Sequence, residues 1–215
     1  HFVDCMLKII INQTNHTMKL KLVLLTALLA GTQVFAQIKT PQPSPAGYIS
    51  QDLGLGRLSV AYSRPSTKGR VIFGDVVPFD KIWRTGANAS TKFSTTEEIK
   101  MEGNTIPAGK YALYTIPGKL EWTIIVHKDT THWGDGGTDY KAEDDLVRFK
   151  VKPLASSIKA ETFTITFANL TTTSATLFLA WENLVVPIKI EANIDAKVMA
   201  SIKTALNPAP TAGTY

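Results

Sequence analysis

The feature of this sequence that most constrains its fold is an alternation of apolar and polar residues with a period of two. It begins near Tyr48 and continues in separate runs to Glu191. Each run places apolar side chains on one face of a β-strand and polar side chains on the other. The clearest runs cover residues 58–62, 122–127, 147–152, 162–167 and 175–181, and further strands are predicted at 92–95, 99–101, 110–116 and 185–190.

Short segments with turn-like residues separate these runs. Gly103 and Asn104 tolerate a positive φ, so residues 102–105 suit a tight hairpin. Pro107 suits the first corner of a turn at 107–109, and we expect further breaks at 171–173 and 182–183. About nine to ten short strands at this spacing predict an all-β fold, an antiparallel β-sandwich. A closed barrel needs the same pattern and is the alternative.

A helical period is found in one stretch after residue 37. Ile194, Val198, Ile202 and Leu206 recur every four residues and form one apolar stripe. The segment 207–208, Asn-Pro, should end this helix. We therefore expect a short C-terminal helix and a tail over residues 193–215, with the start of a further region as the alternative.

The N-terminal segment resembles a targeting signal more than part of a fold. From Met18, two lysines precede an apolar stretch at 22–30, and small residues end at Ala36. This order predicts a signal peptide at 18–36, cleaved after Ala36, and export to the periplasm or the extracellular space. Thr32 stands where a lipoprotein would have cysteine, so no lipid anchor is expected. We interpret residues 1–17 as an upstream extension translated in error, and predict that the domain covers 37–192.

Removing residues 1–36 excludes several classes of function. The one cysteine, Cys5, lies there, so a mature chain would have no thiolate nucleophile or thiolate metal ligand. The removal also takes away three lysines and one aspartate, which lowers the net charge from +5 to +3. So mild a charge gives no support for nucleic-acid binding. We also expect no transmembrane segment after cleavage.

Residues 64–90 do not alternate, although they separate two predicted strands. A loop of this length is uncommon in a compact domain unless it is functional or disordered. Five cations accompany two aspartates, and the loop also contains apolar residues that we expect to be buried. These apolar residues are Val71, Ile72, Phe73, Val76, Val77, Phe79, Ile82 and Trp83. We predict an ordered loop that packs on the sandwich and contains the binding site.

Three segments carry a resemblance to a known family. SRPSTKGRVIFGDVVPFDKIWRTGANASTKF, IPAGKYALYTIPGKLEWTIIVHK and ATLFLAWENLVVPIKIE resemble the domain of unknown function 2911 family, a group of secreted bacterial proteins. The resemblance covers roughly residues 37–192. It implies export but no particular activity, because the family has none established. Some relatives continue into tetratricopeptide-type helical repeats, which the predicted C-terminal helix could introduce.

The loop supplies the main candidates for ligand binding. They are Arg64, Lys68, Arg70, Trp83, Arg84 and Asn88. Guanidinium groups can clamp a carboxylate or another anion with two parallel hydrogen bonds. The alternative is that the arginines stabilise the loop by pairing with Asp75, Asp80 or strand carbonyls, and that Trp83 is a hydrophobic anchor. Arginines facing an open cleft would favour the first interpretation.

Secondary candidates lie outside the loop. They are His127, His132, Trp181 and Glu182. The two histidines and neighbouring aspartates match no established metal-binding pattern, so we predict no metal and no cofactor. Glu182 is the most suggestive acid for hydrolysis, but the sequence nominates no second carboxylate for it.

Three hypotheses of function follow from these residues. The leading one is a non-catalytic binding or interaction module of the cell envelope, with a small anionic or carbohydrate ligand. The first alternative is a hydrolase of envelope carbohydrate or ester. The second is a purely structural domain that presents a C-terminal helical region to a protein partner.

Overall fold

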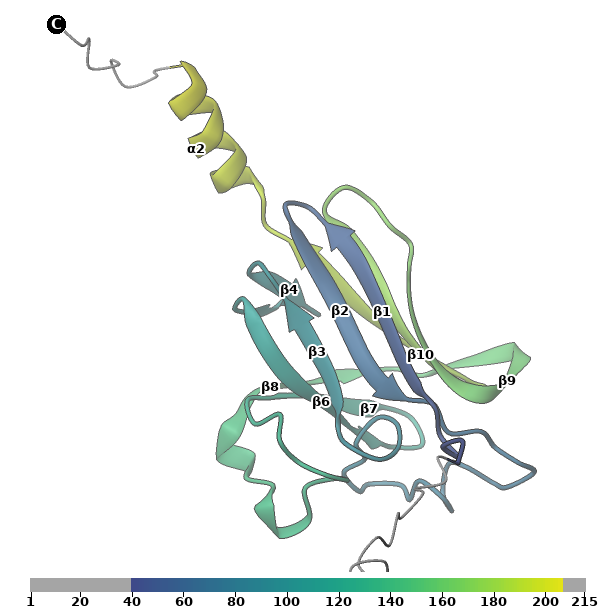
Figure 1. Cartoon of the computed structure of the whole chain (residues 1–215). Helices are drawn as coiled ribbons and strands as arrows, with labels where there is room; N and C mark the ends of the chain where they lie inside the picture. The colour runs from purple at the N-terminus through teal and green to yellow at the C-terminus, as the bar shows by residue number, and fades with distance from the viewer. Residues whose placement is uncertain (1–39, 207–215) are drawn as a thin grey trace, which may run out of the picture. The chain divides into compact units, whose positions relative to one another are not determined.

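The structure, a computed structural model, describes residues 40–206, which include the whole alternating region. The predicted signal peptide, the extension before it and the tail after Leu206 lie outside these residues. Ten strands form two antiparallel sheets (Figure 1). The large sheet has the order β1 (Ala46–Leu53), β2 (Gly56–Ser63), β3 (Thr91–Thr95), β6 (Gly109–Pro117), β7 (Trp122–His127) and β8 (Asp145–Val151). The small sheet has the order β5 (Asn104–Ile106), β4 (Ile99–Met101), β10 (Ser174–Ala192) and β9 (Leu154–Ala168).

The two sheets share one apolar core, which confirms the predicted sandwich and excludes the barrel alternative. The alternating residues of the large sheet, such as Val60, Phe93 and Ile124, are fully buried against Ile165 and Leu177 of the small sheet. The chain passes from one sheet to the other between β3 and β4, between β5 and β6, and between β8 and β9. The predicted C-terminal helix is present as α2 (Asp195–Leu206).

Two details of the strand predictions can be compared with the structure. The predicted hairpin at 102–105 joins β4 to β5, with Glu102 and Gly103 both at positive φ. The break predicted at 182–183 is wrong, because β10 continues through these residues. A register irregularity occurs there instead, and Glu182 adopts φ 52° opposite Ala160 of β9. An irregularity of this kind bends a strand without ending it.

Residues 112–115 of β6 and 124–127 of β7 are buried on both faces of the sheet, which the alternation did not predict. Tyr114 and Ile125 lie on the outer face of the large sheet, yet neither is exposed. Ile82 of the 64–90 loop and Tyr140 pack against them. Tyr140 belongs to the segment between β7 and β8, which also contains two 3-10 turns, η1 (Gly137–Asp139) and η2 (Ala142–Asp144). Two loops therefore cover this part of the outer face.

The 64–90 loop is ordered and reaches both sheets. Ser66 forms a bridge with Thr162 of β9, and Trp83 forms one with Thr115 of β6. Ile72, Val77 and Trp83 are buried in the common core, as expected. The same expectation is wrong for Val71 and Val76, which are exposed.

Candidate functional site

Trp83 attaches the loop to the aromatic core between the two sheets. Its ring stacks on Trp181 of β10 at 5.8 Å and 19°, and it meets Phe163 of β9 edge-on at 5.1 Å. Trp122 of β7 contacts it from the large sheet at 6.2 Å. The indole Nε1 donates a hydrogen bond to the Gly86 carbonyl at 3.0 Å, so the polar atom of this buried side chain is satisfied.

Gly86 allows the loop to turn closely beside β2 and β3. Its φ is 152°, and a Cβ at this position would lie 2.9 Å from the Ser63 carbonyl oxygen and 3.3 Å from Thr91 Oγ1. Only glycine avoids this contact without a shift of the backbone. Gly86 itself lines the cavity described next, together with Trp83 and Arg84.

A cavity of about 240 Å³ lies beside the aromatic cluster. Arg70 and Arg84 line it together with Trp83 and Trp181. Val76, one of the two exposed valines, also faces it. No carboxylate is among its lining residues, although Asp135 lines a smaller adjoining cavity together with Arg84.

The two arginines are oriented by backbone carbonyls. Arg70 donates from Nε to the Thr67 carbonyl at 3.0 Å and from Nη2 to the Ser66 carbonyl at 2.9 Å. Arg84 donates from Nη1 to the Asn88 carbonyl at 3.2 Å. In the part of the chain that the structure describes, neither guanidinium forms an ion pair with a carboxylate. These contacts position the side chains and leave their charge uncompensated.

The other loop candidates have different neighbours. Arg64 donates to the Phe163 carbonyl and to Thr164 Oγ1, which ties the loop to β9. Asn88, at φ 59°, donates from its amide to the Ser44 carbonyl and to Ser63 Oγ. Lys68 is exposed in the turn that precedes Arg70, with φ 49°. None of Arg64, Lys68 and Asn88 lines the cavity.

Glu161 of β9 fastens the turn that carries Arg70. Thr67 Oγ1 donates to Glu161 Oε2, and the Lys68 backbone N–H donates to Glu161 Oε1 at 2.9 Å. The hydrogen bond from Thr67, followed by that from Lys68, holds the pKa of Glu161 below its usual range. The charged carboxylate thus favours the position in which Arg70 faces the cavity.

The four secondary candidates do not form one site, although the rings of His127 and His132 lie 5.4 Å apart. Trp181 lines the arginine cavity, whereas Glu182 lies at the irregularity of β10 and lines none of the described cavities. His127 and His132 are buried on the outer face of the large sheet. A second, smaller cavity of about 90 Å³ shares Trp83, Arg84 and Val76 with the first and adds Asp135.

Both ring nitrogens of each histidine have partners within the protein. His132 Nδ1 lies 2.9 Å from the Tyr114 hydroxyl, and its Nε2 lies 3.3 Å from Asp129 Oδ2. His127 Nδ1 accepts the Asp129 backbone N–H at 3.0 Å, and Nε2 lies 3.1 Å from the Lys141 carbonyl. Burial raises the pKa of Tyr114, so its hydroxyl stays protonated and shares a hydrogen bond with His132 Nδ1. These bonds hold the segment between β7 and β8 against the sheet.

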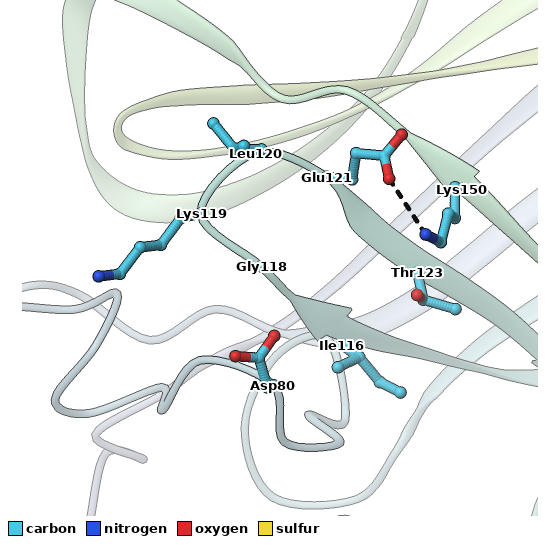
Figure 2. Close-up of a pocket in the computed structure, with 8 residues that line it drawn as sticks. All are labelled: Asp80, Ile116, Gly118, Lys119, Leu120, Glu121, Thr123 and Lys150. Carbon is cyan, nitrogen blue, oxygen red and sulfur yellow. Dashed lines mark hydrogen bonds and ion pairs between the residues drawn. The ribbon is translucent and has the colours of Figure 1, made fainter.

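The largest described cavity, of about 390 Å³, lies beside the hairpin between β6 and β7 (Figure 2). Figure 2 shows Glu121 and Lys150 joined by an ion pair, which measures 3.1 Å. Asp80 and Lys119 add one charge of each sign to the lining. Because its charges balance and none of the sequence-predicted candidates lines it, this cavity is a weaker candidate than the arginine cavity.

The fold and the cavity define the class of protein: a two-sheet antiparallel β-sandwich with a cationic, tryptophan-lined cavity formed by a long loop. Residues 44–190 match the model of the family described as protein of unknown function (DUF2911). The chain belongs to this family, as its three characteristic segments indicated. No curated protein and no solved structure is detectably similar to it. Among residues 40–206, the structure contains no helix with the length and apolar character needed to cross a membrane.

The attachment of the Arg70 turn can be tested through the titration of Glu161. Replacing Thr67 with valine keeps the shape of this buried side chain but removes the hydroxyl donor, so the pKa of Glu161 should rise toward its ordinary value. In the unmodified protein the contribution of this contact to stability is present above the ordinary glutamate pKa. It is lost as the pH falls through the lowered folded-state pKa. Carbon-detected NMR titration of the Glu161 carboxyl measures its pKa in the unmodified protein and in the Thr67→Val protein.

The matched control is Thr162→Val. Thr162 follows Glu161 on β9, and its hydroxyl bonds Ser66 of the loop but does not bond Glu161. It should leave the pKa of Glu161 unchanged. A pKa that is equally low in the Thr67→Val protein would show that Thr67 does not hold this carboxylate.

Proposed function

We propose that this chain is a non-catalytic binding module for a small anionic ligand that carries a carboxylate or a phosphate. The observation that supports this proposal most is the presence of Arg70 and Arg84 in one cavity with no carboxylate in its lining. A charge-assisted hydrogen bond from a guanidinium to such an anion is about twice as strong as a neutral one. An acid is therefore the ligand that gains most from this cavity.

The remaining hydrogen-bond donors fit the same ligand. A guanidinium has five N–H groups. Within the described chain, Arg70 uses its Nε and one Nη, and Arg84 uses one Nη. Each arginine keeps N–H groups for a ligand, and its own carbonyl contacts fix its direction beforehand. Such preorganisation reduces the entropy lost on binding.

The indole rings shape the cavity without offering much surface to a ligand. Trp83 is 8% exposed and Trp181 is 2% exposed. Their edges make part of the wall apolar, while Arg84 is half-buried and Arg70 is exposed. Electrostatic attraction between the half-buried Arg84 and an acid is stronger than it would be in open solvent.

The cell envelope is the proposed location, on the basis of the signal-peptide pattern before Gln37. A carbohydrate acid of the envelope is therefore one natural source of the ligand. Expression from Met18 in a Gram-negative bacterium, followed by N-terminal sequencing of the periplasmic fraction, tests this proposal. The expected first residue is Gln37, and retention of uncleaved chain in the cytoplasm would contradict export.

A hydrolase acting on envelope carbohydrate or ester is the second candidate function. One observation favours it: Asp135 faces the smaller cavity beside Trp83 and Arg84. Glu182, the acid nominated from the sequence, lines neither of these two cavities. Hydrolysis would then depend on Asp135, and an Asp135→Asn variant that loses turnover of a glycoside or ester would support this candidate.

The binding proposal predicts that the double variant Arg70→Ala, Arg84→Ala loses affinity for small acids. Succinate, inorganic phosphate and neutral glucose are suitable probes, with binding followed by two-dimensional NMR titration. Each lost charge-assisted bond costs about 1.5 kcal/mol or more, so affinity for the anion that binds should fall at least about a hundredfold. Glucose should not compete with that anion.

The control is the double variant Arg57→Ala, Lys150→Ala, which removes the same charge from two exposed ion pairs outside the cavity. It should change affinity only slightly, through the general field of the protein. Equal affinity in the two double variants would contradict the proposed site, and thermal melting checks that each variant is folded.

A further inference from the structure

A separate hollow, of about 350 Å³, lies on the outer face of the large sheet. None of its lining residues belongs to the arginine cavity or to the candidates found in the sequence. The lining consists of Tyr48, Ser59, Ala61, Lys92, Ser94 and Lys110. The two long loops pack against the outer face around Tyr114 and Ile125 and leave the part that lines this hollow uncovered.

The strand register explains why these six residues meet. Tyr48, Ala61 and Lys92 are direct partners across β1, β2 and β3. In the next row on the same face, Ser59, Ser94 and Lys110 are direct partners across β2, β3 and β6. Cross-strand partners have Cβ atoms about 5 Å apart. Small residues in the middle of both rows leave the hollow, and the larger side chains surround it.

Lys92 is held in place by Ser90, which lies two residues earlier in the chain. Its Nζ donates to Ser90 Oγ, and Ser90 Oγ in turn donates to the His132 carbonyl at 3.3 Å. Lys92 is half-buried, and burial lowers its pKa, while the charge of Asp129 acts in the opposite direction. In residues 40–206, neither Lys92 nor Lys110 has a carboxylate within ion-pair distance. An anion in the hollow would give these two lysines a partner of opposite charge.

The other walls indicate what the anion is attached to. The hydroxyls of Ser59 and Ser94 lie 2.6 Å apart on the floor, and each can also bond a ligand hydroxyl. Tyr48 is 66% exposed and presents a broad ring surface at the edge. Two ammonium groups, two hydroxyls and one exposed aromatic ring match a hydroxylated ring that bears an acidic group.

We propose that this hollow is a second binding site, whose ligand is an acidic sugar. The acidic group lies between Lys92 and Lys110, the sugar hydroxyls bond Ser59 and Ser94, and the sugar ring lies against Tyr48. A uronic acid and a sugar phosphate share this chemistry. The site does not depend on the arginine cavity, because the two have no lining residue in common.

Glucuronate, glucose 6-phosphate and glucose are the probes that test this proposal on the full chain. NMR titration should show saturable shifts of the β2 and β3 amides around Ser59 and Ser94 with at least one of the two acids. Binding only of glucuronate identifies a carboxylate site, and binding only of glucose 6-phosphate identifies a phosphate site. Glucose should bind at least about tenfold more weakly, since it lacks the charge.

Three variants separate a built site from a general effect of charge. Lys110→Gln should weaken binding of the acid about tenfold, whereas Lys100→Gln, an exposed lysine of β4 in the other sheet, should not. Ala61→Leu fills the hollow and keeps both lysines, and it should abolish the shifts. Arg70→Ala, Arg84→Ala should bind as the unmodified protein does, which distinguishes this site from the arginine cavity.

Two results would overturn the proposal. One is the absence of saturable binding of either acid at millimolar concentration. The other is unchanged affinity in the Ala61→Leu protein, with amide dispersion like that of the unmodified protein confirming that the variant is folded.

Discussion

The insertion of Trp83 between the two sheets is the interaction on which the rest of this structure depends. Its ring touches Trp122 of the large sheet and Phe163 and Trp181 of the small sheet. One side chain of a loop therefore connects both layers of the sandwich. Burial of a tryptophan with several aromatic neighbours is among the largest single contributions that a side chain makes to stability.

The position of the candidate site follows from this insertion. Arg84 is the next residue along the chain, and its direction is set by the short turn that ends at Asn88. Arg70 enters the same cavity from the other end of the loop, where Glu161 fixes the preceding turn. Both arginines belong to one loop but are held by different parts of the sandwich. The loop thus presents two cations in a defined geometry, as recognition of a carboxylate or phosphate requires.

Much of the fold was predictable from the period-two alternation. Neighbouring side chains of a strand point to opposite faces, so apolar residues such as Val60 and Ile165 mark the face that is buried. The burial of Tyr114 on the outer face of β6 was not predictable, because a loop covers it and no local sequence pattern specifies the path of that loop. The sequence pattern predicts a break between strands at Glu182 for a related reason. A polar pair such as 182–183 fits a turn as well as a strand irregularity, and only pairing with β9 decides between them. For the candidate site, the sequence predicted that arginines and Trp83 of the loop would form it. That Arg70 and Arg84 line one cavity could be seen only in the folded loop.

The role of Trp83 as the anchor of the loop can be measured through the free energy of unfolding of two tryptophan variants. Trp83→Ala removes a side chain that is 8% exposed, whereas Trp133→Ala removes one that is 74% exposed. Urea denaturation should show a loss of about 3–5 kcal/mol for Trp83→Ala, and less than about 1 kcal/mol for Trp133→Ala. Losses of similar, small size in both proteins would contradict the account.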